Sequence, residues 1–196
     1  MSDRRAVVTR NTKETSIKVE LNIDGSGQTQ ITTGILFLDH MLDQLARHGI
    51  FDINISASGP DNHHVVEDVA ICLGKAFQQA LDDKKGINRM AHSIVPMDEA
   101  LAMVALDISG RGYSVVDVEF AQLNIGELPS DLIRHFFESF ATEARMNIHI
   151  KVFYGINDHH KAEAIFKAFA KTMDTATRLD PRIRNSLPST KDYIEK

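Results

Sequence analysis

Two stretches of sequence decide the fold: ETSIKVELNIDGSG at residues 14–27 and EALAMVALDISGRG at residues 99–112. In both, apolar residues alternate with their neighbours before a glycine-containing turn, the pattern of a half-buried β-strand. The offset between them is constant, because 99 − 14 and 108 − 23 both give 85. The chain therefore carries an internal repeat, and such a repeat sets the architecture.

The same order of elements surrounds both stretches. A short helical pattern contains His40 in the first half and His135 in the second, and the strand patterns FDINISAS and MNIHIKVF follow. A histidine pair then opens a long helical pattern in each half. We predict an α/β (α+β) fold of two strand-helix-strand-helix half-domains, at about 4–90 and about 91–180, with sheets backed by the long helices.

Composition limits the class of protein. The chain has 196 residues, 43% of them hydrophobic and 25% charged, which predicts one globular domain over residues 1–196. No apolar run approaches the roughly 18 residues of a membrane span, MSDRRAVVTR at the start is not a secretory signal, and Cys72 is the single cysteine. We expect a cytoplasmic protein. The net charge of −5 argues against a general nucleic-acid binder.

Nine histidines stand out, and histidine is the commonest metal ligand among side chains. The motif His-His-x-x-Glu occurs at residues 63–67 and 159–163. Residues four apart share a helix face, so the first histidine and the glutamate can bind one cation while the second histidine reaches another. With the single histidines of the short helices, symmetry suggests two sites: His63, Glu67, His135 and His160; and His40, His64, His159 and Glu163.

The ligand types leave the metal open among zinc, iron, cobalt, nickel and manganese. Basic and hydroxyl side chains elsewhere suit a phosphate group. Taken with a metal site, they predict a small phosphorylated substrate; they are Arg89, Arg111, Lys167, Ser189 and Lys191.

With these residues in view, the chain resembles the imidazoleglycerol-phosphate dehydratase family over about Arg4 to Lys191. The resemblance rests on several motifs together: FLDHML, DNHH, PMDEA, SGR, HFF, the two His-His-x-x-Glu runs and PSTK. It implies dehydration of D-erythro-imidazole glycerol phosphate to imidazole acetol phosphate in L-histidine biosynthesis. It also implies a ribosomal protein S5 domain 2-like fold, two Mn²⁺ per active site, and trimers that build a 24-subunit shell.

The family's functional positions map onto this sequence. They give the same two metal sets as the repeat symmetry and a substrate-binding C-terminal tail over residues 181–196. The implied dinuclear centre binds the substrate as an imidazolate. The expected catalytic residues are Glu163 and Glu14, as alternatives for proton transfer, with His48 beside them. The substrate contacts implied by the resemblance are Glu14, Gln44, His48, Arg89, Arg111, Lys167, Ser189 and Lys191.

Two other functions fit parts of the pattern. A dinuclear hydrolase also combines two cations with a phosphate-binding cluster, but such sites are usually richer in aspartate. A metal-storage protein would account for the histidines and leave the basic tail without a role. Whether dehydration, phosphate release or neither occurs distinguishes the three.

Overall fold

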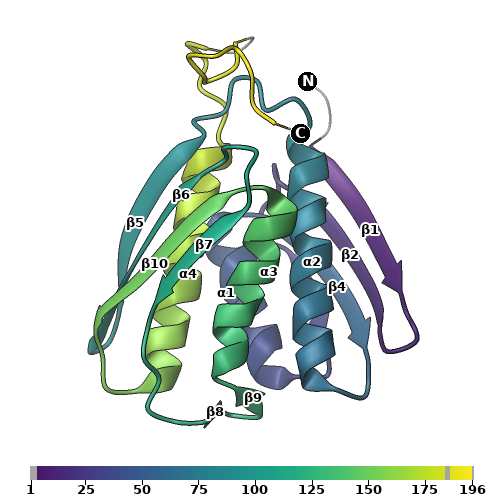
Figure 1. The fold of residues 1–196 in the computed structure, drawn as a ribbon, viewed down its shortest axis with the longest axis vertical. Coiled ribbons are helices and arrows are strands. Elements are labelled where there is room, and N and C mark those ends of the chain that lie inside the picture. Colours follow the sequence, from purple (N-terminus) through teal and green to yellow (C-terminus); the bar gives the residue numbers. More distant parts are fainter. Residues whose placement is uncertain (1–3, 184–185, 196) are drawn as a thin grey trace.

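The computed structural model describes residues 4–183 and 186–195. Two four-stranded sheets enclose a layer of four helices between them (Figure 1). The first sheet has the order β1 (Arg5–Asn11), β2 (Ser16–Asn22), β4 (Asp52–Ser58) and β3 (Thr29–Thr32). The second has the order β5 (Met90–Met97), β6 (Ala100–Asp107), β10 (Asn147–Tyr154) and β7 (Tyr113–Asp117). The helices are α1 (Leu36–Gly49), α2 (Asn62–Leu81), α3 (Asp131–Ala144) and α4 (Asp158–Thr177).

The two sheets have the same pairing scheme. In each, two antiparallel pairs are followed by one parallel pair, β3 with β4 and β7 with β10. The strands and helices expected from the sequence are confirmed, but the expected strand-helix-strand-helix order was incomplete, since each half contributes four strands to its sheet. The missed strands include β3, which is only four residues long with the largely polar sequence TQIT, and a small hairpin of β8 (Asn124–Ile125) and β9 (Leu128–Pro129).

The halves share one hydrophobic core, because each helix pair combines a helix from either half. Helix α1 packs against α4, and α2 packs against α3. A Cβ added at Gly74 of α2 would lie 2.8 Å from the Phe140 carbonyl oxygen of α3, so a glycine is needed for this close approach. Aromatic side chains fill the layer; those fully buried are Phe51, Phe77, Phe136, Phe137, Phe140, Phe166 and Phe169.

Equivalent caps start the two long helices. The Asp61 side chain accepts a hydrogen bond of 2.8 Å from the His63 backbone N–H, and the Asn157 side chain accepts one of 2.9 Å from the His159 N–H. Such caps satisfy backbone donors that have no partner within the helix. Both histidine pairs are thereby fixed in the first turn of a helix. None of the helices in the described part of the chain combines the length and apolar character needed to cross a membrane.

Candidate metal centre

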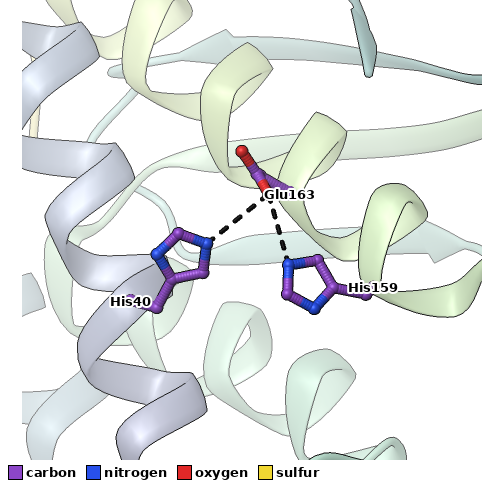
Figure 2. Close-up of side chains that lie close together, drawn as sticks. All are labelled: His40, His159 and Glu163. Carbon is purple, nitrogen blue, oxygen red and sulfur yellow. Dashed lines mark ion pairs between the residues drawn. The ribbon is translucent and has the colours of Figure 1, made fainter. Parts of the chain in front are cut away.

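The first cluster joins α1 to α4. The Nε2 atoms of His40 and His159 lie 3.5 and 3.3 Å from the same carboxylate oxygen, Oε2 of Glu163 (Figure 2). His159 and Glu163 are one helical turn apart, which places them on one face of α4. The Glu163 side chain is only 9% exposed, whereas both imidazoles are accessible to solvent. We call His40, His159 and Glu163 triad A.

Three of the predicted substrate-binding residues, Lys167, His48 and Gln44, lie beside triad A. The other Glu163 oxygen, Oε1, lies 2.6 Å from Lys167 Nζ. Burial raises the pKa of the Glu163 carboxyl, but Lys167 and His40 outweigh it and the pKa lies below its usual value. Burial, together with the charges of Lys167 and Lys171, lowers the pKa of His48, whose Nε2 lies 3.0 Å from Gln44 Oε1. A neutral imidazole and an ammonium group thus stand beside an ionised carboxylate.

The second cluster joins α2 to α3. His135 Nε2 lies 3.5 Å from Glu67 Oε1, and the His135 ring stacks on the His63 ring with centroids 4.7 Å apart. We call His63, Glu67 and His135 triad B. The Nε2 atom of His135 is buried and has no hydrogen-bond partner among the described residues. A buried nitrogen without a partner is costly unless something binds it.

Both triads have the geometry of a cation site. Two ligand atoms that each lie about 2.1 Å from one ion are about 3.0–3.5 Å apart at tetrahedral or octahedral angles. The histidine-to-carboxylate separations of 3.3 and 3.5 Å in triad A and 3.5 Å in triad B match this spacing. All candidate ligand atoms of each triad lie within 4.8 Å of one another. Imidazole nitrogens and one carboxylate per site therefore fit a divalent transition metal.

The fourth predicted ligand of each site lies elsewhere in the chain. His64 and His160 do not belong to either group of clustered ligand atoms found among the described residues. His64 Nδ1 lies 3.7 Å from Glu14, and His160 Nδ1 lies 2.6 Å from Glu99. One copy of the chain thus assembles three of the four predicted ligands of each site.

Comparison with known proteins identifies the family of the chain. The family model described as imidazoleglycerol-phosphate dehydratase matches residues 33–173, a range that contains all eight predicted ligands. A relative of that name from Dehalococcoides mccartyi is 57% identical over 195 residues, covering 100% of both chains. One from Roseiflexus is 55% identical over 196 residues, covering 98% of each. The chain belongs to the imidazoleglycerol-phosphate dehydratase family.

Solved structures of the dehydratase family have the same fold. The structure from Pyrococcus furiosus has a TM-score of 0.84 and 35% identity and covers 95% of this chain and 100% of its own. The structure from Staphylococcus aureus has a TM-score of 0.82 and 34% identity, with 89% and 100% covered. Membership places the chain among the hydro-lyases, as an enzyme of histidine biosynthesis.

The candidate proton-transfer groups of this dehydratase-family chain do not form one cluster within a single copy. Glu163 and His48 belong to the α1–α4 pair. Glu14 lies between β1 and β2, beside His64 at the amino end of α2, and its side chain is 62% exposed. Its turn is held by the Thr12 hydroxyl, which accepts hydrogen bonds from the backbone N–H groups of Glu14 and Thr15.

The predicted phosphate-binding residues are also dispersed. Arg89 is bonded to both carboxylate oxygens of Asp107, at 2.7 and 3.0 Å, and donates to the Pro188 carbonyl oxygen at 2.7 Å. This contact attaches the tail that carries Ser189 and Lys191. Ser189 is half-buried and Lys191 and Arg111 are exposed, whereas Ile194 of the tail is buried. Positions 184, 185 and 196 of the predicted tail lie outside the described residues.

Glu99 is not among the site residues predicted from the sequence, although the structure places it against His160. Backbone N–H donation from Asn157, the His160 contact and donation from Ile156 lower the pKa of Glu99 to about 2. The Glu99 contact in turn raises the pKa of His160. The repeat itself held the signal, because the offset of 85 aligns Glu99 with Glu14.

Proposed function

We propose that this chain removes water from D-erythro-imidazole glycerol phosphate to give imidazole acetol phosphate in L-histidine biosynthesis, acting in the cytoplasm. The observation that carries the proposal is the pair of His-His-Glu triads, each built from both halves of the chain. The cluster of Lys167, His48 and Gln44 beside triad A supports a polar substrate at that position. Family membership supplies the reaction.

We propose further that each active site holds two Mn²⁺ ions. One ion would be bound by His40, His159, Glu163 and His64, and the other by His63, Glu67, His135 and His160. When bound, the two ions would hold the substrate imidazole as an imidazolate and so favour departure of the neighbouring hydroxyl. The fit of the triads to a cation and the buried Nε2 of His135, which has no hydrogen-bond partner among the described residues, support this set.

The fourth ligands lead to a proposal about assembly. His64 and His160 stand outside the triads, with side chains 37% and 25% exposed. We infer that each triad is completed by a histidine of another copy, in trimers that build a 24-subunit shell. Because Glu14 lies 3.7 Å from His64, the same contact would bring Glu14 to triad A.

Different residues of the chain are assigned to proton transfer and to metal binding. Elimination requires that a carbon-bound proton be removed and that the hydroxyl leave as water. The Glu163 carboxylate already faces two imidazoles and Lys167, whereas the Glu14 carboxylate is largely exposed. This favours Glu14 for moving the proton and Glu163 for holding the metal. His48, with its lowered pKa, is neutral and able to exchange a proton with substrate.

Phosphate binding is assigned to the basic residues and the tail. The proposed contacts combine guanidinium, ammonium and hydroxyl donors, which suit a phosphate dianion. Attachment of the tail through Arg89 supports this placement. The proposed phosphate contacts are Arg89, Arg111, Lys167, Ser189 and Lys191.

We also propose that the halves, at about 4–90 and about 91–180, are copies of one unit in a single domain with the ribosomal protein S5 domain 2-like fold. The shared order of motifs, with an offset of 85 between the two strand stretches and 96 between the histidine pairs, and the equal strand order of the two sheets support this origin.

A single assay tests the function. The chain is freed of metal with a chelator, reloaded with Mn²⁺ and given imidazole glycerol phosphate, and both ketone and inorganic phosphate are measured. Ketone without phosphate, only after reloading, is the expected result. Release of phosphate would instead favour a dinuclear hydrolase, and neither product would favour metal storage. The metal-free chain and a His159→Ala variant serve as controls.

A further inference from the structure

Glu99 occupies a tightly defined position. It is the second residue of the two-residue turn between β5 and β6, in which Met97 pairs with Ala100. The first turn residue, Asp98, has φ of 45°, a left-handed conformation that few residues other than glycine adopt. A positive φ is the usual geometry at this position of a two-residue hairpin turn, and aspartate is among the residues that tolerate it. Here the turn directs the Glu99 carboxylate toward the amino end of α4.

Both oxygens of this carboxylate are used. Oε1 accepts hydrogen bonds from the backbone N–H groups of Ile156, at 3.1 Å, and Asn157, at 2.7 Å. Oε2 lies 2.6 Å from Nδ1 of His160. If the carboxylate rotated away from the His160 ring, it would also lose its hydrogen bonds to the backbone N–H groups of Ile156 and Asn157. A Cβ added at Gly155 would lie 2.9 Å from the Ala100 Cβ, so the close approach of the two segments depends on this glycine.

The hydrogen bond determines which nitrogen of His160 is available. An ionised carboxylate only accepts hydrogen bonds, so in the neutral imidazole of His160 Nδ1 must carry the proton and Nε2 keeps its lone pair. Metal-binding histidines commonly donate their other ring N–H to a carboxylate, which fixes the tautomer and the ring orientation. In that tautomer Nε2, which lies 3.8 Å from Asp98 Oδ2, is the ring nitrogen available to a metal.

The first half lacks this device. With the offset of 96 between the histidine pairs, Pro60 corresponds to Ile156 and Asp61 to Asn157. Proline has no backbone N–H to donate, and Asp61 places a negative charge where the second half has an amide. Glu14 Oε2 accordingly lies 3.7 Å from His64 Nδ1, too far for a hydrogen bond.

We propose that Glu99 is a positioning residue for His160: its carboxylate fixes the Nδ1–H tautomer and directs Nε2 toward the cation that triad B binds. The inference rests on the proposed metal centre and adds to it a residue that touches neither metal nor substrate. It makes the two cation positions unequal, because only the histidine from the second half has a fixed orientation.

The test is a Mn²⁺ titration of the metal-free full-length chain, with free Mn²⁺ followed by electron paramagnetic resonance. In Glu99→Gln, the side-chain carbonyl still accepts from the helix end, but the amide N–H₂ faces His160 Nδ1 and forces the proton onto Nε2. We expect one of the two binding steps to weaken by roughly 10- to 100-fold. The weakened step should be the one that disappears in His160→Ala. The other step, which disappears in His64→Ala, should keep its Mn²⁺ affinity in Glu99→Gln. Glu14→Gln is the matched control and should leave both affinities within about threefold of wild type, because Glu14 makes no hydrogen bond to His64.

Thermal unfolding of the metal-free variants shows whether the helix end is intact. If Glu99→Gln does not fold, Glu99→Asp provides the test instead. Aspartate keeps the charge but is too short to reach the His160 ring, so the same Mn²⁺ binding step should weaken. Equal affinities in wild type and the Glu99 variants, or equal weakening of both steps, would overturn the role of Glu99 and leave the metal centre standing. A wild-type chain that binds no Mn²⁺ would overturn the centre and this inference together.

Discussion

At the amino end of α4, the Glu99 carboxylate accepts two backbone hydrogen bonds and contacts His160, whereas at the amino end of α2 the equivalent Glu14 carboxylate is 62% exposed. The first helical turns of α4 and α2 also differ in their charged contacts. Lys161 forms a 2.8 Å ion pair with the buried Asp158, while the equivalent Val65 is apolar. The Glu99 carboxylate is thus held by hydrogen bonds, whereas the Glu14 carboxylate makes none among the described residues and has only the 3.7 Å contact with His64. In the proposed mechanism these matched positions serve different purposes: the hydrogen-bonded carboxylate orients a ligand, and the exposed one moves a proton.

The largest expected effect comes from the exposed carboxylate. Glu14→Gln removes the proposed proton-transfer group without changing its size, so the turnover number should fall by roughly 10²- to 10⁴-fold. Metal content should stay unchanged, which separates this variant from Glu99→Gln. Steady-state kinetics and elemental analysis on the same samples provide the measurement. A turnover number within tenfold of wild type would remove Glu14 from the chemistry.

The ion pair at the amino end of α4 provides the next test. Lys161→Val introduces the residue of the first half and leaves the buried Asp158 carboxylate, 1% exposed, without its cation and with the Gln122 backbone N–H as a remaining partner. The free energy of unfolding should fall by about 3 kcal/mol. Adding Asp158→Asn, the amide found at the equivalent Asn62, should restore most of the loss. Urea unfolding at one fixed protein concentration measures both variants; equal losses in the single and double variants would contradict the coupling.

The two glycines before the long helices should be equally intolerant of a side chain. A Cβ at Gly59 would lie 2.9 Å from the Glu14 carbonyl oxygen, and one at Gly155 would lie 2.9 Å from the Ala100 Cβ. Each alanine variant should lose about 1–3 kcal/mol of unfolding free energy. The consequences should then diverge. Gly59→Ala displaces Glu14 and lowers the turnover number, whereas Gly155→Ala displaces the turn of Glu99 and weakens Mn²⁺ binding; identical functional effects would argue against the division of roles.

The smallest effect is expected at two equivalent arginines. Arg4 pairs with Asp24 and donates to the Thr177 carbonyl oxygen at the end of α4, whereas Arg89 holds the tail at Pro188. Lysine cannot reproduce the two-pronged guanidinium contact. Arg89→Lys should raise the KM for substrate about three- to tenfold, and Arg4→Lys should leave KM unchanged while lowering the melting temperature slightly. A KM unaffected by Arg89→Lys would separate this arginine and its tail contact from substrate binding.

The local spacing of apolar residues was sufficient to predict most of the secondary structure. The alternation around Val19 and Val104 and the helical spacing after His64 and His160 identified the main strands and both long helices. Edge strands such as β3 were missed because four largely polar residues give no clear alternation, and their pairing with β4 depends on a neighbour that lies 24 residues away, at Ile53 from Thr29.

Three features follow from spacing along the chain and were therefore determined by the sequence itself. They are the repeat, the position of each histidine pair at the start of a helix, and the placement of His159 and Glu163 on one helix face. Only the tertiary structure decided that His40 faces Glu163, that the Nε2 atom of His135 is buried and has no hydrogen-bond partner among the described residues, and that Glu99 is hydrogen-bonded while Glu14 is exposed. These outcomes depend on packing between segments far apart in the chain, which spacing along the sequence does not reveal.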